Sequence, residues 1–286
     1  MSRIISSPST IWTALLAALL FGASTPLTKQ LLHDLSPIPL AWLLYLGSGV
    51  GLGLIRLMRD RGWRTPSLSR REWLWLLLAI GFGGVLGPPA LMLGLTTTSA
   101  ASASLLLNLE AVLTAVLAWV VFRENTDRRV VLGMALIVVG AVLLAWLFSW
   151  NKRSGLGAWW IAGACLCWAL DNNFTCKVSA SDALFLTGLK GTVASVVNTG
   201  IALMLGARVP AVPVISAAMV VGLFEYSISL VLFVLTLRDL GSTRTSAYFS
   251  TAPFMGAAIA ILAVGDHASP TFWMAAVLWA RAYGST

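Results

Sequence analysis

The sequence predicts an all-α membrane protein with ten transmembrane helices, arranged as two inverted five-helix repeats, the tenth helix being short. Hydrophobic residues make up 58% of the 286 residues and charged residues only 10%, whereas a soluble domain carries roughly 25% charge. The apolar residues form long charge-free runs, and a spanning helix needs roughly 20 such residues. The two halves also repeat one pattern. This composition excludes an ordinary soluble enzyme, a disordered chain and a disulfide-rich secreted module.

The first half contains five expected spans. The run from Trp73 to Leu109 is too long for one helix, so we expect it to turn near Gly94–Ser99. The fourth span then carries Glu110. The five spans cover residues 11–28, 38–55, 73 to the turn, 101–122 and 130–151. Together they predict a first repeat over residues 11–150.

The second half is expected to contain five more spans, forming a second repeat over residues 156–286. These spans cover residues 156–177, 183–205, 213–237, 245–265 and 271–283. The last would reach roughly 20 Å along its axis, less than a hydrocarbon core of about 30 Å. Asp171, Lys190 and Glu225 lie inside the sixth, seventh and eighth spans.

The basic residues predict the orientation. The chain carries 19 Lys and Arg against 11 Asp and Glu, and most of the basic residues lie in short loops on the side of the N-terminus. The Arg56–Arg71 loop is the richest. Cytoplasmic loops carry such an excess, so both termini should be cytoplasmic. Because the charge lies between apolar runs, we expect a lipid bilayer as the partner and no nucleic acid.

An internal repeat links the two halves. Residues 21–30 read FGASTPLTKQ and residues 168–177 read WALDNNFTCK; each is an apolar helix broken by small or polar residues. Residues 99–124 correspond in the same way to residues 241–266, which pairs Glu110 with Ala252. Because five helices per unit is an odd number, the second unit enters from the opposite face. Inverted repeats of this kind place a transporter's substrate site near the midplane.

With these features the chain resembles the EamA-type family of the drug/metabolite transporter superfamily. The resemblance rests on the ten spans in two units, on WALDNN at 168–173, and on NLEA at 108–111 and Arg123-Glu124 in the fourth helix. It implies a permease of the bacterial inner membrane, often an exporter of amino acids or other small metabolites. The family's last helix serves in oligomer contacts, so a homodimer is one implied assembly.

Two carboxylates are candidates for substrate binding or coupling. Glu110 lies 14 residues before Glu124, roughly 21 Å along a helix, and Glu225 lies 13 residues before Arg238, roughly 20 Å. Both would sit near mid-bilayer, where an ionisable side chain has a partner or lines water. They would bind a cationic substrate group or share a proton. The alternative is that each caps a neighbouring helix or bonds to Ser, Thr or Trp.

Asp171 and Lys190 are expected to meet between the sixth and seventh helices. They lie roughly 9 Å and 12 Å from the same cytoplasmic end of their helices. The favoured interpretation is a buried ion pair that fixes packing, because neither charge is easily buried alone. The functional alternative is a gate that opens when substrate or a proton disrupts the pair.

Other candidate binding residues are polar or aromatic. Asn108 comes from the NLEA landmark, while Asn172 and Trp168 come from the WALDNN stretch. Trp12, Trp168 and Tyr226 are candidates for stacking on a substrate. Pro26 and the pair Asn172-Asn173 mark two candidate helix interruptions, which would expose backbone groups to a substrate; a kinked but continuous helix is the alternative.

Taken together, these observations favour a secondary transporter that works by alternating access, coupled to protons or to substrate exchange. The chain has no P-loop motif, so ATP is not the expected energy source, and no cofactor is expected. The cysteines at 165, 167 and 176 lack zinc spacing and predict no metal site. The alternatives are a lipid-carrier flippase on a related fold, an intramembrane enzyme and a channel.

Overall fold

A computed structural model describes residues 8–60, 67–123, 152–207, 210–249 and 251–263, together with Gly265, Trp273 and Val277. All regular secondary structure in these residues is helical, as predicted. The fifth predicted span, 130–151, lies outside the described residues, and the tenth lies outside them except for the last two single residues.

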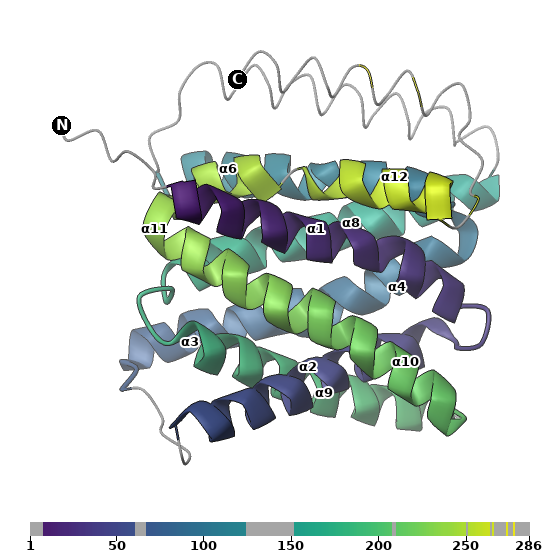
Figure 1. Cartoon of the computed structure of the whole chain (residues 1–286), viewed down its shortest axis with the longest axis horizontal. Coiled ribbons are helices and arrows are strands. Elements are labelled where there is room, and N and C mark those ends of the chain that lie inside the picture. The colour runs from purple at the N-terminus through teal and green to yellow at the C-terminus, as the bar shows by residue number, and fades with distance from the viewer. Residues whose placement is uncertain are drawn as a thin grey trace.

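The described residues of the first half form four helical runs (Figure 1). They consist of α1 (Pro8–Leu31), α2 (Pro37–Asp60), α3 (Arg70–Ala79), the π-helical segment η1 (Ile80–Leu86), α4 (Gly87–Thr97), α5 (Ala100–Leu106) and α6 (Asn108–Val120). Ser69 begins α3 with a capping box, accepting from the Glu72 amide while the Glu72 carboxylate accepts from the Ser69 amide. The third run continues without a break to Thr97, so the predicted turn near Gly94–Ser99 falls at its end.

The second half follows a similar plan. It consists of α8 (Lys152–Cys176), α9 (Ala183–Met204), α10 (Val212–Leu223), the π-helical segment η2 (Phe224–Ser229), α11 (Leu230–Phe249) and α12 (Ala252–Ala263). Inside α11, Gly241 has φ 77° and ψ 173°, a conformation that only glycine adopts readily, and the helix axis breaks there. The predicted ninth span, 245–265, lies after this break, and within it the helix that follows Gly241 ends at Phe249 and α12 begins at Ala252.

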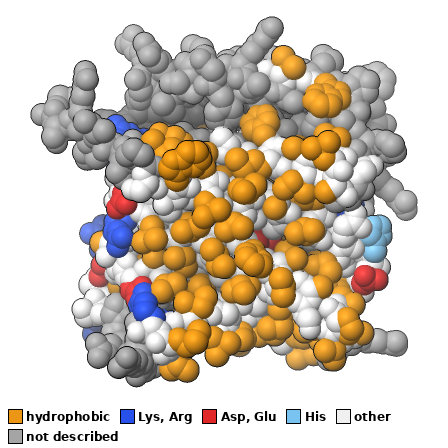
Figure 2. Space-filling view, viewed as in Figure 1, with side chains coloured by type: hydrophobic (Ala, Val, Ile, Leu, Met, Phe, Trp, Pro, Cys, Tyr) orange, Lys and Arg blue, Asp and Glu red, His pale blue; other side chains and the backbone are white. Residues whose placement is uncertain are grey.

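Among the described residues, six helical runs are long and apolar enough to cross a membrane. They are Ser9–Leu31, Pro37–Arg59, Arg70–Thr97, Ser102–Val120, Ala183–Met204 and Val212–Gly241. Large apolar side chains such as Trp12 and Met204 are exposed, and Figure 2 shows hydrophobic side chains spread across the face between the two ends of the helices. Lys and Arg gather at the left edge, where α2 ends and α3 begins. Such a belt fits lipid contact.

Corresponding helices of the two halves run in opposite directions. The ion pair of Arg59 with Asp182 places the end of α2 beside the start of α9, and α2 and α9 pack along each other. Similarly, α1 ends near the end of α4, since Lys29 donates to the Leu95 carbonyl. By contrast, α8 ends near the start of α3, where Phe174 stacks on Trp75. This is the geometry that an inverted repeat requires.

At Pro26 and at Asn172-Asn173 the structure has a continuous helix, the alternative to an interruption. Pro26 lies inside a continuous α1, and α8 runs through both asparagines to Cys176. The irregular backbone lies instead in η1 and η2, which occupy the third helical run of each half. A π-helical turn widens the helix and frees carbonyl groups, and it is common at functional sites. The two halves therefore carry matching irregularities in other helices than those predicted.

Candidate functional site

A small cavity lies between the two halves at the centre of the helix packing. Side chains from both halves line it: Phe21, Tyr45 and Glu110 from the first, and Trp168, Asp171, Asn172, Tyr226, Leu230, Phe233 and Phe249 from the second. Its volume of about 20 Å³ holds little more than one water molecule. In this conformation the cavity is closed around its own side chains.

Glu110 supplies a buried carboxylate to this cavity. The helix is interrupted at Leu107, so α6 begins at Asn108 and Glu110 falls in its first turn, where the helix dipole favours negative charge. The side chain is 8% exposed. The Asn172 amide donates to Glu110 Oε1 over 2.9 Å and to Thr114 Oγ1 over 3.2 Å. Glu110 is thus held by a neutral donor from the opposite half.

Asn173, the next residue of α8, fastens the same two helices together. Its Nδ2 donates to the carbonyl of Thr114 over 3.0 Å and to the carbonyl of Ala169 over 2.9 Å. Thr114 lies one helical turn beyond Glu110 and therefore on the same face of α6. Asn172 therefore binds the carboxylate, while Asn173 holds α8 against α6 beside it.

The carbonyl groups freed by the two π-helical segments accept hydrogen bonds from neighbouring helices. In η1, the Gly83 carbonyl accepts from Tyr45 OH over 2.8 Å and from Trp168 Nε1 over 3.1 Å. In η2, the Tyr226 carbonyl accepts from Ser48 Oγ over 2.6 Å. Tyr45 and Trp168 line the cavity, so η1 positions two of its aromatic walls.

Asp171 and Lys190 lie in contact between α8 and α9. Lys190 Nζ lies 2.6 Å from Asp171 Oδ1 and 2.8 Å from Oδ2. Thr175 donates to Asp171 Oδ1 over 2.8 Å and accepts from Lys190 Nζ over 3.2 Å. Both charged side chains are at most 7% exposed. The structure therefore brings together the two residues predicted to pair. Asp171 lines the cavity, whereas Lys190 contacts Asp171 and does not line the cavity.

Glu225 is buried in η2 but does not line the cavity. Its side chain is 1% exposed, and its Oε2 has no hydrogen-bond partner among the described residues. The hydroxyls of Ser24 and Tyr226 lie beside it. In the internal repeat, Ser24 corresponds to Asp171. At this position of the repeat the second half has a charged residue on α8 and the first half has a serine on α1; the carboxylate beside that serine comes from η2 of the second half.

The structure separates the predicted site residues. Trp168, Asp171, Asn172 and Tyr226 line the cavity with Glu110, whereas Asn108, although fully buried, does not. The suggestion that Trp12 stacks on a substrate is wrong, because this side chain is 70% exposed on the outer face of α1.

Sequence reasoning missed Thr114 and the rings at 21, 45, 233 and 249. Thr114 was detectable from its four-residue spacing to Glu110. The rings carry no local signal, because their role depends on how distant helices pack.

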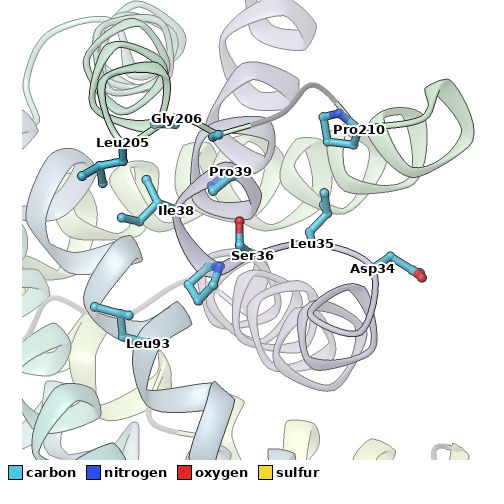
Figure 3. A pocket seen from close by; sticks show the side chains of 12 residues that line it. Asp34, Leu35, Ser36, Ile38, Pro39, Leu93, Leu205, Gly206 and Pro210 are labelled. Carbon is cyan, nitrogen blue, oxygen red and sulfur yellow. The ribbon is translucent and has the colours of Figure 1, made fainter.

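A second, larger cavity opens at one end of the bundle (Figure 3). It has a volume of about 510 Å³ and lies between the α1–α2 connection, α4 and the end of α9, with Ser36, Leu93 and Leu205 among its lining residues. At the other end of the α2–α9 pair, Arg59 Nη2 lies 2.5 Å from Asp182 Oδ2. The α2–α9 helix pair therefore has an ion pair at one end and a cavity at the other.

Comparison with known proteins identifies the family. The EamA-like transporter family matches this chain twice, over residues 8–146 and 155–280. The chain belongs to the EamA-like transporter family. Two consecutive matches agree with the opposed halves of the structure, and the resemblance inferred from the sequence is confirmed. The family makes this chain a multi-pass membrane protein of the transporter class.

A curated relative and a solved structure resemble most of this EamA-like chain. An uncharacterized transporter from Methanothermobacter thermautotrophicus (strain Delta H) is 28% identical over 262 residues, which cover 86% of this chain and 76% of the relative. A crystal structure of a protein is 17% identical, with a TM-score of 0.72, covering 98% of this chain and 96% of that one. At this identity the likeness shows a shared fold.

Proposed function

We propose that this EamA-like protein is a secondary transporter of the bacterial inner membrane that exports amino acids or other small metabolites by alternating access, with both termini cytoplasmic. The observation that carries the proposal is the central cavity, whose walls come from both opposed halves. Inverted repeats bind substrate at this position and expose it by rocking against each other.

Two features of the site support alternating access. The cavity is closed in this conformation, so a substrate enters only when the halves move apart. The two ends of the α2–α9 pair also differ, since one is held by Arg59 and Asp182 and the other is hollow. A transporter that exposes one binding site to each side of the membrane in turn must open at one end of its helix bundle while the other end stays closed.

Energy coupling is proposed to involve protons or substrate exchange. Glu110 and Glu225 are both buried and neither forms an ion pair within the described part of the chain. Buried carboxylates in transporters commonly take part in proton relays or bind substrate. Glu110 is the proposed substrate contact because it lines the cavity, and Glu225 is proposed to affect coupling through Tyr226, which does line it.

The test is transport by the purified protein in liposomes. Amino acids, amines and other small metabolites are screened for uptake and for counterflow, with and without a pH gradient. Saturable counterflow supports a transporter, and stimulation by the gradient supports proton coupling. Flux that never saturates identifies a channel, and no flux for any compound refutes the proposal. Glu110→Gln should reduce every flux that is found.

A further inference from the structure

We infer that the central cavity selects an organic monocation: a compact or flat apolar body with one positive charge, in preference to a zwitterion or an anion. This inference rests on the proposed transport function and narrows its substrate class to small metabolites with one positive charge and no carboxylate, rather than amino acids. Three properties of the cavity support it: its ring walls, the sign of its uncompensated charge, and the absence of a lining cation among the described residues.

Aromatic rings form most of the wall. Six of the ten lining residues are aromatic: Phe21, Tyr45, Trp168, Tyr226, Phe233 and Phe249. A ring face attracts a cation through its quadrupole, and the attraction reaches about 2 kcal/mol or more when water is excluded. Rings converging from both halves therefore suit a cationic apolar body, whereas their faces repel an anion.

The lining carries two acidic side chains, Glu110 and Asp171. Glu110 receives hydrogen bonds only from neutral Asn172 in the contacts described, so its charge remains available to a ligand. Asp171 also lines the cavity, but Lys190 binds both of its oxygens and neutralises it. A ligand that brings one positive charge would neutralise Glu110 without breaking the Asp171–Lys190 pair.

A zwitterion fits less well. Its carboxylate needs a cationic partner, and the described lining contains none. Lys190 is already held by Asp171 and by Thr175. Transferring it to a substrate would leave Asp171 buried without a counter-ion, which costs several kcal/mol. The same argument excludes a simple anion more strongly.

The rings also indicate how the ligand is accommodated. Tyr45 and Tyr226 stack with centroids 4.3 Å apart, and Phe249 lies 4.7 Å from Phe233 and 5.0 Å from Phe21. These contacts close the cavity to about 20 Å³. A flat ligand entering between the rings replaces ring–ring contacts by ring–ligand contacts, so opening loses little stacking energy.

The test uses three labelled probes that share a phenyl group and differ in charge: benzyltrimethylammonium, phenylalanine and 3-phenylpropionate. Binding is measured with the full-length protein in lipid nanodiscs, and counterflow in liposomes. Benzyltrimethylammonium should bind about tenfold more tightly than phenylalanine, and 3-phenylpropionate should not compete. Glu110→Gln should weaken binding of the cation by about tenfold, whereas Glu72→Gln, at the exposed α3 cap, should leave it unchanged.

A second pair of variants keeps the test decisive if Glu110→Gln fails to fold. Tyr226→Phe retains the ring and should bind the cation within about twofold of wild type, whereas Tyr226→Leu should weaken binding about fivefold. No binding of benzyltrimethylammonium, equal binding of phenylalanine, or equal affinities for the two Tyr226 variants would overturn the inference. Phenylalanine counterflow with those results would leave the proposed transport function intact.

Discussion

The buried Asp171–Lys190 pair allows a sharp test of the packing at the site. Replacing Asp171 by Asn leaves the Lys190 ammonium, at 5% exposure, without a counter-ion. Breaking a buried pair in this way costs about 3–5 kcal/mol. For a chain of this length we expect the Tm to fall by roughly 10 °C, and Lys190→Met should have a similar effect.

The double variant separates the ion pair from other causes. With Asp171→Asn and Lys190→Met together, no charge is left unpaired, so most of the lost stability should return. Exchanging the two residues should rescue less, because the Gly83 backbone packs directly against the Asp171 carboxyl and leaves no room for a lysine. The assay is thermal unfolding of the purified protein, followed by size-exclusion chromatography.

The exposed pair Arg59–Asp182 is the matched control. Its side chains are 44% and 27% exposed, so removing one partner should cost no more than about 1 kcal/mol. The reasoning about burial is wrong if Asp171→Asn is as stable as wild type, or if the double variant is no more stable than either single one.

Three further predictions follow from contacts elsewhere. Gly83→Ala should lower the free energy of unfolding by about 1–3 kcal/mol, and with it the Tm, because a Cβ there would lie 1.9 Å from Asp171 Oδ2. Gly81→Ala should leave the Tm unchanged, because a Cβ at Gly81 would meet open space. Although burial alone would raise the pKa of Asp182, its contacts with Arg59 hold that pKa below the usual value. The stabilisation is therefore present at neutral pH and lost as the pH falls below about 4, so unfolding scans of Asp182→Asn and wild type should converge there. Ser69→Ala removes a cap acceptor and should cost about 1 kcal/mol, seen as faster amide exchange in the first turn of α3.

Several parts of the site could be predicted from the sequence because they depend on local spacing. Asp171 and Lys190 lie at similar depths from the same ends of neighbouring helices, and a charge in lipid needs a partner, so their meeting follows from position alone. Glu110 was found as a carboxylate in an apolar run. Asn108 belongs to the same motif, but its side chain lies away from the cavity.

Other features had no usable sequence signal. A proline or two adjacent asparagines favour an irregular helix, yet α1 and α8 continue through them. The irregular turns arose in η1 and η2, where Tyr45, Trp168 and Ser48 from distant helices supply donors to the freed carbonyls. Such donors become visible only once the helices are packed.

The sequence by itself determined that the chain lies in a bilayer and that its halves are related, because hydropathy and charge are summed along the chain and need no contacts. Only the tertiary structure decided which side chains meet. Six rings and two carboxyl groups, spread from residue 21 to residue 249, converge on a single cavity. Neither half contains that cavity alone, because opposed helices of both halves form its walls.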